Sequence, residues 1–92
     1  MSAIELEPSL TCCIETEAKR AYREALRKLL AAEGDYPQLT ERVELLRLFL
    51  ESTDFRQLRT EYEKHLLAGK KVKVTICMER GEPRYRAEVI SP

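Results

Sequence analysis

Residues 71–89 read KVKVTICMERGEPRYRAEV, and this stretch decides the fold. Apolar and polar residues alternate along 71–78 and again along 84–89, which is the two-residue period of strands with one buried face. Residues 80–83 lie between the two runs and include a glycine and a proline, which is typical of a turn. The stretch therefore predicts an antiparallel β-hairpin.

The alternation also predicts how the two strands pair. A turn about Gly81 and Glu82 gives three apolar pairs on one face: Met78 with Tyr85, Ile76 with Ala87, and Val74 with Val89. On the other face, the same register gives two polar contacts: Glu79 with Arg84, and Thr75 with Glu88. A slip of one residue would turn every apolar side chain to the other face. We therefore expect the apolar face to pack against helices.

A third strand is expected beside the hairpin, because two strands alone are marginal in water. Residues Ser2–Glu7 place Ile4 and Leu6 in alternation with glutamates before Pro8, which is typical of a short strand. The alternative third strand is the same hairpin of a second chain, related by a two-fold axis.

Three helices are expected between these strands, because apolar residues recur there with the helical period. Their expected ranges are about 14–33, 38–51 and 54–68. The sequence therefore predicts a single α+β domain over residues 1–92. It consists of a three-helix N-terminal segment followed by a C-terminal antiparallel β-hairpin, with the short N-terminal strand as a further partner.

Glycines and polar residues predict where these helices begin and end. Gly34 and Gly69 are expected to end the first and third helices, because glycine readily adopts the left-handed conformation that follows a helix. Residues 35–37 are expected to form a turn. Thr53 or Asp54 is expected to cap the third helix.

The second helix is apolar around most of its circumference. Its stripe Leu39, Val43, Leu46 and Leu50 is widened by Leu45, Leu48 and Phe49. A surface helix needs an apolar stripe of only about 100°. The second helix is therefore expected to form either the centre of the fold or a subunit interface. The interface candidates are Leu45, Leu46, Leu48 and Phe49.

Composition restricts the classes of function. The chain has 16 Lys plus Arg and 16 Asp plus Glu, so its net charge gives no basic excess for phosphate binding. Three cysteines are a poor disulfide framework, and we expect free thiols in a reducing compartment, the cytoplasm. We see no signal peptide, and no apolar run is long enough to span a bilayer, so we expect no membrane partner.

The residues that carry chemistry form no recognisable site. His65 is the only histidine, and Cys12, Cys13 and Cys77 do not follow a zinc-binding spacing. There is no glycine-rich phosphate loop and no paired catalytic carboxylates in an apolar setting. We therefore expect no cofactor, no metal and no catalytic residue, and we expect that the protein is not an enzyme.

A nucleic-acid surface is the alternative hypothesis. The order of helix, short break, helix and hairpin is that of a winged helix, in which the third helix reads the major groove. The candidate contacts are Arg56, Arg59 and Lys64 on the third helix, and Lys71, Lys73, Arg84 and Arg86 on the hairpin. Glu61 and Glu63 on the same side of the helix, together with the zero net charge, count against it.

The apolar second helix and the open edge of a short sheet favour a different function. We expect a small cytoplasmic, non-enzymatic protein-interaction or regulatory protein. We expect it to bind a protein partner, first of all a second copy of itself in a homodimer. DNA binding in the manner of a winged helix is the alternative. No motif in the chain identifies a family.

Overall fold

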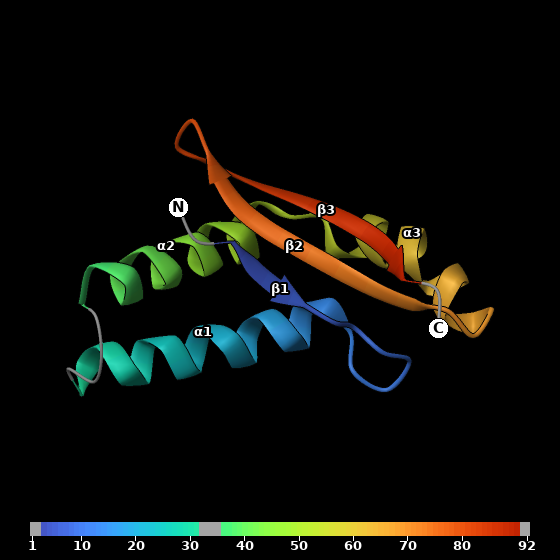
Figure 1. The fold of residues 1–92 in the computed structure, drawn as a ribbon, viewed down its shortest axis with the longest axis horizontal. Coiled ribbons are helices and arrows are strands. Elements are labelled where there is room, and N and C mark those ends of the chain that lie inside the picture. The colour runs from blue at the N-terminus through green and yellow to red at the C-terminus, as the bar shows by residue number, and fades with distance from the viewer. Residues whose placement is uncertain (1–2, 32–35, 91–92) are drawn as a thin grey trace.

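The computed structural model describes residues 3–31 and 36–90. In chain order its elements are β1 (Ile4–Leu6), α1 (Ile14–Leu30), α2 (Tyr36–Ser52), α3 (Phe55–Leu67), β2 (Lys71–Glu79) and β3 (Glu82–Ile90). Figure 1 shows the three helices and the long β2–β3 hairpin. The α+β fold is as expected, including the short N-terminal strand.

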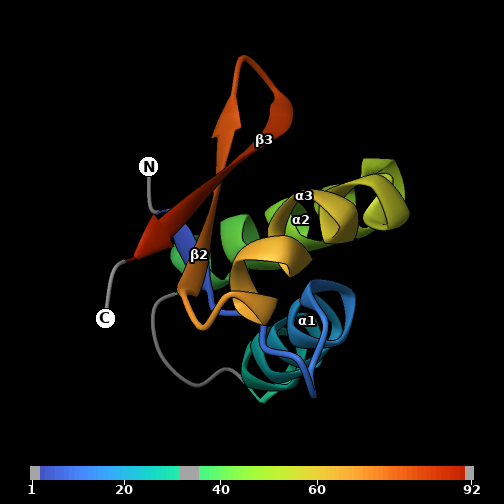
Figure 2. The same cartoon turned by 90° about the vertical axis from the view of Figure 1, so that its right-hand side faces the viewer.

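The strands form one antiparallel sheet in the order β1-β2-β3. All three helices lie on the same side of this sheet, as Figure 2 shows. α2 and α3 pack against the sheet, while α1 packs mainly on α2 and reaches β1. The opposite face of the sheet is not covered by any described element. The fold therefore has a helical layer, a sheet and one open sheet face.

β1 is the third strand of the sheet. Ile4 lies opposite Ile76, and Leu6 lies opposite Val74. Both β1 side chains enter the core, with 2% and 6% of their surface exposed. The third strand is therefore β1 of the same chain. The alternative prediction, in which the hairpin of a second chain supplies this strand, is not what the structure shows.

The register of the hairpin differs by two residues from the expected one. The turn consists of Arg80 and Gly81 alone, with φ angles of 53° and 78°. Positive φ at both central residues is typical of the two-residue type I′ turn, whose twist matches that of the strands. The predicted four-residue turn was wrong, because Glu82 and Pro83 already belong to β3.

This shift changes the pairs and keeps the faces. The observed apolar pairs are Met78 with Pro83, Ile76 with Tyr85, Val74 with Ala87, and Val72 with Val89. Because the shift is an even number of residues, the apolar side chains still face the helices. The predicted polar contacts were wrong: Thr75 lies opposite Arg86, Cys77 opposite Arg84, Lys73 opposite Glu88, and Glu79 opposite Glu82.

The start of α2 differs from the predicted one. Tyr36 and Pro37 belong to the first turn of α2 instead of the predicted turn, because proline has no N–H to lose there and its φ is already helical. The predicted stop at Gly34 lies outside the described residues, as does Asp35.

α3 begins and ends as expected. The carboxylate Oδ1 of Asp54 accepts the backbone N–H groups of Arg56 and Gln57, at 3.1 and 3.2 Å. Gly69 follows the helix with a φ of 83°. A hydrogen bond also joins α3 to the start of α1, because the backbone N–H of Ile14 donates to the Tyr62 hydroxyl at 3.0 Å. Tyr62 thereby ties the start of α1 to the middle of α3 within the core.

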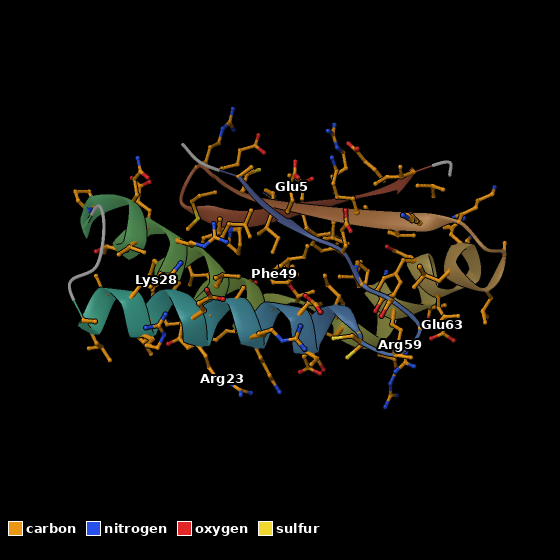
Figure 3. All side chains as sticks on the ribbon, turned by 60° about the horizontal axis from the view of Figure 1, so that its bottom comes forward. Glu5, Arg23, Lys28, Phe49, Arg59 and Glu63 are labelled. Carbon is orange, nitrogen blue, oxygen red and sulfur yellow. The ribbon has the colours of Figure 1, made fainter. Side chains whose placement is uncertain are left out.

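α2 is the central helix of the fold. Leu45, Leu46 and Phe49 are buried where α2 meets α1 and the sheet. Figure 3 shows Phe49 in the interior, between α1 and the sheet. Its ring makes edge-to-face contacts with Phe55, at a centroid distance of 5.4 Å, and with Tyr85, at 6.0 Å. Such contacts stabilise aromatic clusters beyond simple burial.

Candidate interaction surface

β3 is the least covered strand of the sheet. Its helix-facing side chains are Pro83, Tyr85, Ala87 and Val89, which we call the β3 strip. Tyr85 is 40% exposed and Val89 is 43% exposed. By contrast, Val74 and Ile76, on the same face of β2, are fully buried. An apolar strip along the outer strand is therefore left in contact with solvent.

The position of the helices explains this exposure. The helical layer covers β1 and β2, and α2 is the helix that packs against β3. The Tyr85 ring contacts Phe49 on one side and remains partly open on the other. Partial burial raises the pKa of Tyr85, and the nearby carboxylates of Glu61 and Asp54 raise it further. A tyrosine hydroxyl holds its proton at neutral pH even without this shift, so Tyr85 can donate a hydrogen bond.

β3 also has an open main-chain edge. It pairs with β2 on one side and with no described strand on the other. The strand is nine residues long, and a long unpaired edge is a ready template for another strand. β1, at the opposite edge of the sheet, has only three residues. The sheet is therefore asymmetric, with one short edge and one long edge.

The outer face of the sheet carries charges of both signs. Three contacts between oppositely charged side chains lie on it: Lys73 with Glu5 at 3.5 Å, Arg84 with Glu82 at 3.0 Å, and Arg86 with Glu88 at 2.6 Å. Such exposed pairs contribute at most about 1 kcal/mol each. They place a carboxylate beside Lys73, Arg84 and Arg86, so this face carries charges of both signs.

Three of the four predicted interface residues do not reach the surface. Leu45, Leu46 and Phe49 are at most 3% exposed within one chain, and only Leu48 is half-buried. Of the two alternatives for the second helix, these three side chains fit the centre of the fold. The exposed apolar surface lies instead on β3, which the sequence reasoning placed against the helices.

The sizes of the helix-facing residues give a sequence signal for the exposure of the β3 strip. The helix-facing residues of β2 are Val72, Val74, Ile76 and Met78, which are all large and aliphatic or thioether side chains. Those of β3 include a proline and an alanine, which bury less apolar area than valine or isoleucine. A strand with smaller inward residues is less strongly driven into the core. This difference points to β3 as the outer strand.

The seven predicted nucleic-acid contacts lie on two separate surfaces. Lys71, Lys73, Arg84 and Arg86 alternate with the helix-facing residues of β2 and β3, so they are on the outer face of the sheet. Arg56, Arg59 and Lys64 line a groove beside α3. Arg59 is paired with Glu63 at 2.6 Å, and Figure 3 shows the two side chains together on α3. The seven candidate side chains therefore do not form one continuous basic surface.

The groove beside α3 has an open volume of about 520 Å³ and borders the N-terminus of α1. Cys13 is the residue at the N-cap position of α1, and its Sγ lies 3.2 Å from the Thr16 hydroxyl. That hydrogen bond lowers the pKa of the Cys13 thiol, with help from the backbone N–H groups of Thr16 and Glu15 and from the charge of Arg59. This thiol is therefore easier to ionise than an ordinary cysteine.

The neighbouring thiol responds in the opposite direction. Cys12 donates from Sγ to the Glu17 carboxylate at 2.9 Å, which raises the pKa of Cys12. Cys12, Cys13 and Cys77 are all free thiols. Over residues 3–31 and 36–90, no three His, Cys, Asp or Glu side chains are grouped closely enough to hold a metal ion.

Comparison with known proteins places the chain in a family. One family model matches residues 3–91, nearly the full length. The chain belongs to that family. The family is uncharacterised, so membership brings no activity with it. No curated protein matches the chain, and no solved structure does. Among the described helices, none is long and apolar enough to cross a membrane.

Proposed function

We propose that this is a small, non-enzymatic protein-interaction or regulatory protein that self-associates through β3. The observation that carries the proposal is the coincidence of two features on one strand. The β3 strip leaves Tyr85 and Val89 partly exposed, and the nine-residue edge beside it has no strand partner. Strand addition uses these features together, with main-chain hydrogen bonds for affinity and alternate side chains for specificity.

Single exposed apolar residues on a protein surface are ordinary. Leu10, Leu30 and Leu67, for example, are well exposed, and none of them lies in a strand. The β3 strip differs because its exposed residues lie next to each other and beside unpaired main-chain groups. An exposed apolar edge of this kind is a liability in a monomer and is usually covered.

The free thiols support a location for this function. Cys12, Cys13 and Cys77 are unpaired, which fits a reducing compartment. We include the cytoplasm in the proposal on this basis. The mixed charges of the outer sheet face fit a protein partner better than a polyanion, because the arginines there already contact glutamates.

The test is the mass of the protein in solution, measured by sedimentation from micromolar to millimolar concentration. We expect the wild-type chain to associate, and Val89→Lys to abolish association by placing a charge in the β3 strip. Leu30→Lys is the matched control, because Leu30 is 79% exposed on α1 and should tolerate the change. A chain that stays monomeric throughout, or one whose association ignores Val89→Lys, would contradict the proposal.

A further inference from the structure

We infer that the partner of β3 is β3 of a second copy, paired antiparallel about a two-fold axis through Ala87. This inference rests on the proposed self-association and specifies its geometry. The resulting sheet is continuous, with three strands from each copy. Three observations lead to this register: the hydrogen-bonding phase of β3, the order of its charges, and the order of its apolar residues.

The turn fixes which main-chain groups of β3 are free. In antiparallel strands, opposite residues alternate between hydrogen-bonded and non-hydrogen-bonded pairs. The two-residue turn makes Glu79 and Glu82 a hydrogen-bonded pair, so Met78 and Pro83 form a non-hydrogen-bonded one. Proline suits that position because it has no N–H to donate. The main-chain groups of β3 that face the open edge are therefore those of the β3 strip.

These free groups limit the length of any added strand. Tyr85, Ala87 and Val89 each present an N–H and a C=O to the open edge, whereas Pro83 presents a carbonyl alone. A partner strand therefore gains most by pairing with residues 84–90. With Ala87 opposite its own copy, Tyr85 lies opposite Val89 of the second copy, and about six main-chain hydrogen bonds form.

The charges on the outer face select this register from its neighbours. With the axis at Ala87, Arg86 lies opposite Glu88 of the second copy. The two-fold symmetry repeats this pair on the other side of the axis, where Glu88 lies opposite Arg86 of the second copy. Within one chain Arg86 already contacts Glu88 at 2.6 Å. The four side chains then alternate in sign around the axis, so each arginine has a glutamate beside it and another across from it. Opposite charges facing each other stabilise a strand pair.

The neighbouring registers bring like charges together. An axis at Arg86 would face that arginine with its own copy, and an axis at Glu88 would do the same with glutamates. An axis at Tyr85 would place Arg84 opposite Arg86 of the second copy. Like charges directly opposite each other destabilise a strand pair. Registers that differ by one residue would set polar side chains against apolar ones. The axis at Ala87 is free of these conflicts.

The apolar face completes the match. The register places Tyr85 beside Val89 of the second copy on both sides of the axis, with the two small Ala87 side chains between them. Tyr85 and Val89 are the two large apolar residues of the described sheet that remain substantially exposed in one chain. Aromatic and β-branched residues are favourable cross-strand partners. The pairing therefore covers the surface that a single chain leaves open.

The charge arrangement provides the first test. Arg86→Glu and Glu88→Arg each place like charges across the axis in the homodimer, and each is expected to weaken it about tenfold. An equimolar mixture restores opposite charges at both positions, so a heterodimer of near wild-type affinity should form. Arg84→Glu is the matched control, because Arg84 faces the uncharged Ile90 of the second copy. A mixture that associates no better than either variant alone would overturn the register.

Amide hydrogen exchange in the wild-type chain provides the second test and does not depend on any variant. The amides of Tyr85, Ala87 and Val89 should gain protection as the protein concentration rises. The amide of Arg86, which faces β2, should be protected at every concentration. A dimer without concentration-dependent protection at Ala87 would overturn this inference and leave self-association standing. A chain that is monomeric at all concentrations would overturn both proposals.

Discussion

The two edge strands of the sheet have the same kind of alternating sequence, but their apolar side chains are buried to different extents. β1 contributes Ile4 and Leu6, which are almost completely buried by the helices. β3 contributes Tyr85 and Val89 on the same face, and both keep about two fifths of their surface exposed. β1 is three residues long and β3 is nine.

The difference shows that alternation determines which face of a strand is apolar. How much of that face is buried is determined by the helices that pack against it. Both strands turn their apolar residues toward the helices, because each pairs in register with β2. The helical layer covers β1 and β2 and extends to β3 mainly through α2. Hydrophobic burial stabilises only the area that is removed from water. β1 is therefore part of the core, and β3 is its margin.

The largest expected effect tests the covered edge. Ile4→Ala removes a buried side chain from the core and should destabilise the chain by about 2–5 kcal/mol, through lost burial and the cavity left behind. Urea unfolding at low protein concentration measures the loss. An effect below about 1 kcal/mol would mean that β1 is not held in the core, and the contrast between the two edges would disappear.

An intermediate effect is expected from the turn that sets the position of β3. Gly81 has a φ of 78°, and Gly81→Ala places a Cβ in open space but in an unfavourable backbone conformation. The cost should be about 1–2 kcal/mol. Arg80→Asn is the control, because asparagine adopts positive φ more readily than arginine and should stabilise the hairpin slightly. Thermal unfolding of the two variants should shift in opposite directions, and a shift in the same direction would argue against the type I′ turn.

The pH dependence of stability compares a tyrosine in the core with one at the margin. Burial raises the pKa of both Tyr62 and Tyr85, so the folded chain holds these protons more tightly than the unfolded chain does. The contribution to stability is complete below the ordinary tyrosine pKa of about 10 and is lost as the pH rises through the raised value.

Stability should therefore fall above pH of about 10, and the Tyr62→Phe and Tyr85→Phe variants should each show a shallower fall. At neutral pH the two variants should differ. Tyr62→Phe leaves the buried N–H of Ile14 without its acceptor and should cost about 1–3 kcal/mol, whereas Tyr85→Phe should be close to neutral. Urea unfolding across the alkaline range measures both effects, and an equal cost at neutral pH would remove the distinction.

The smallest effect on the isolated chain is expected at the open edge. Val89→Ala should cost less than about 1 kcal/mol at low protein concentration, because valine is already partly exposed there. The cost should grow as the concentration rises, since the proposed dimer would bury Val89. Unfolding curves at two concentrations check this, and a cost that is independent of concentration would mean that Val89 stays exposed.

The sequence predicts the faces of the hairpin better than its pairs. Alternation identifies which residues of 71–89 point to the helices, and the structure agrees. The register depends on whether Glu82 belongs to the turn or to the strand, and alternation is the same in both cases because the shift is even. Only the positive φ of Arg80, which a sequence does not display, separates the two.

The candidate site was harder to predict for a related reason. The apolar circumference of α2 has two explanations, and a sequence cannot choose between burial by other helices and burial by a partner. In the fold, α1 and the sheet supply that burial for Leu46 and Phe49. The exposure of β3 depends on how far a layer of helices extends across a sheet, which is a property of tertiary packing.

The shortness of β1 has a consequence for how far assembly can proceed. In the proposed dimer, the two ends of the combined sheet are β1 strands of three described residues, each followed by the buried Pro8. Such ends offer too few main-chain groups to recruit another sheet. Addition of further chains to the sheet edges should therefore stop at the dimer. The dimer offers no long edge on which the open-ended polymerisation that produces fibrils could continue.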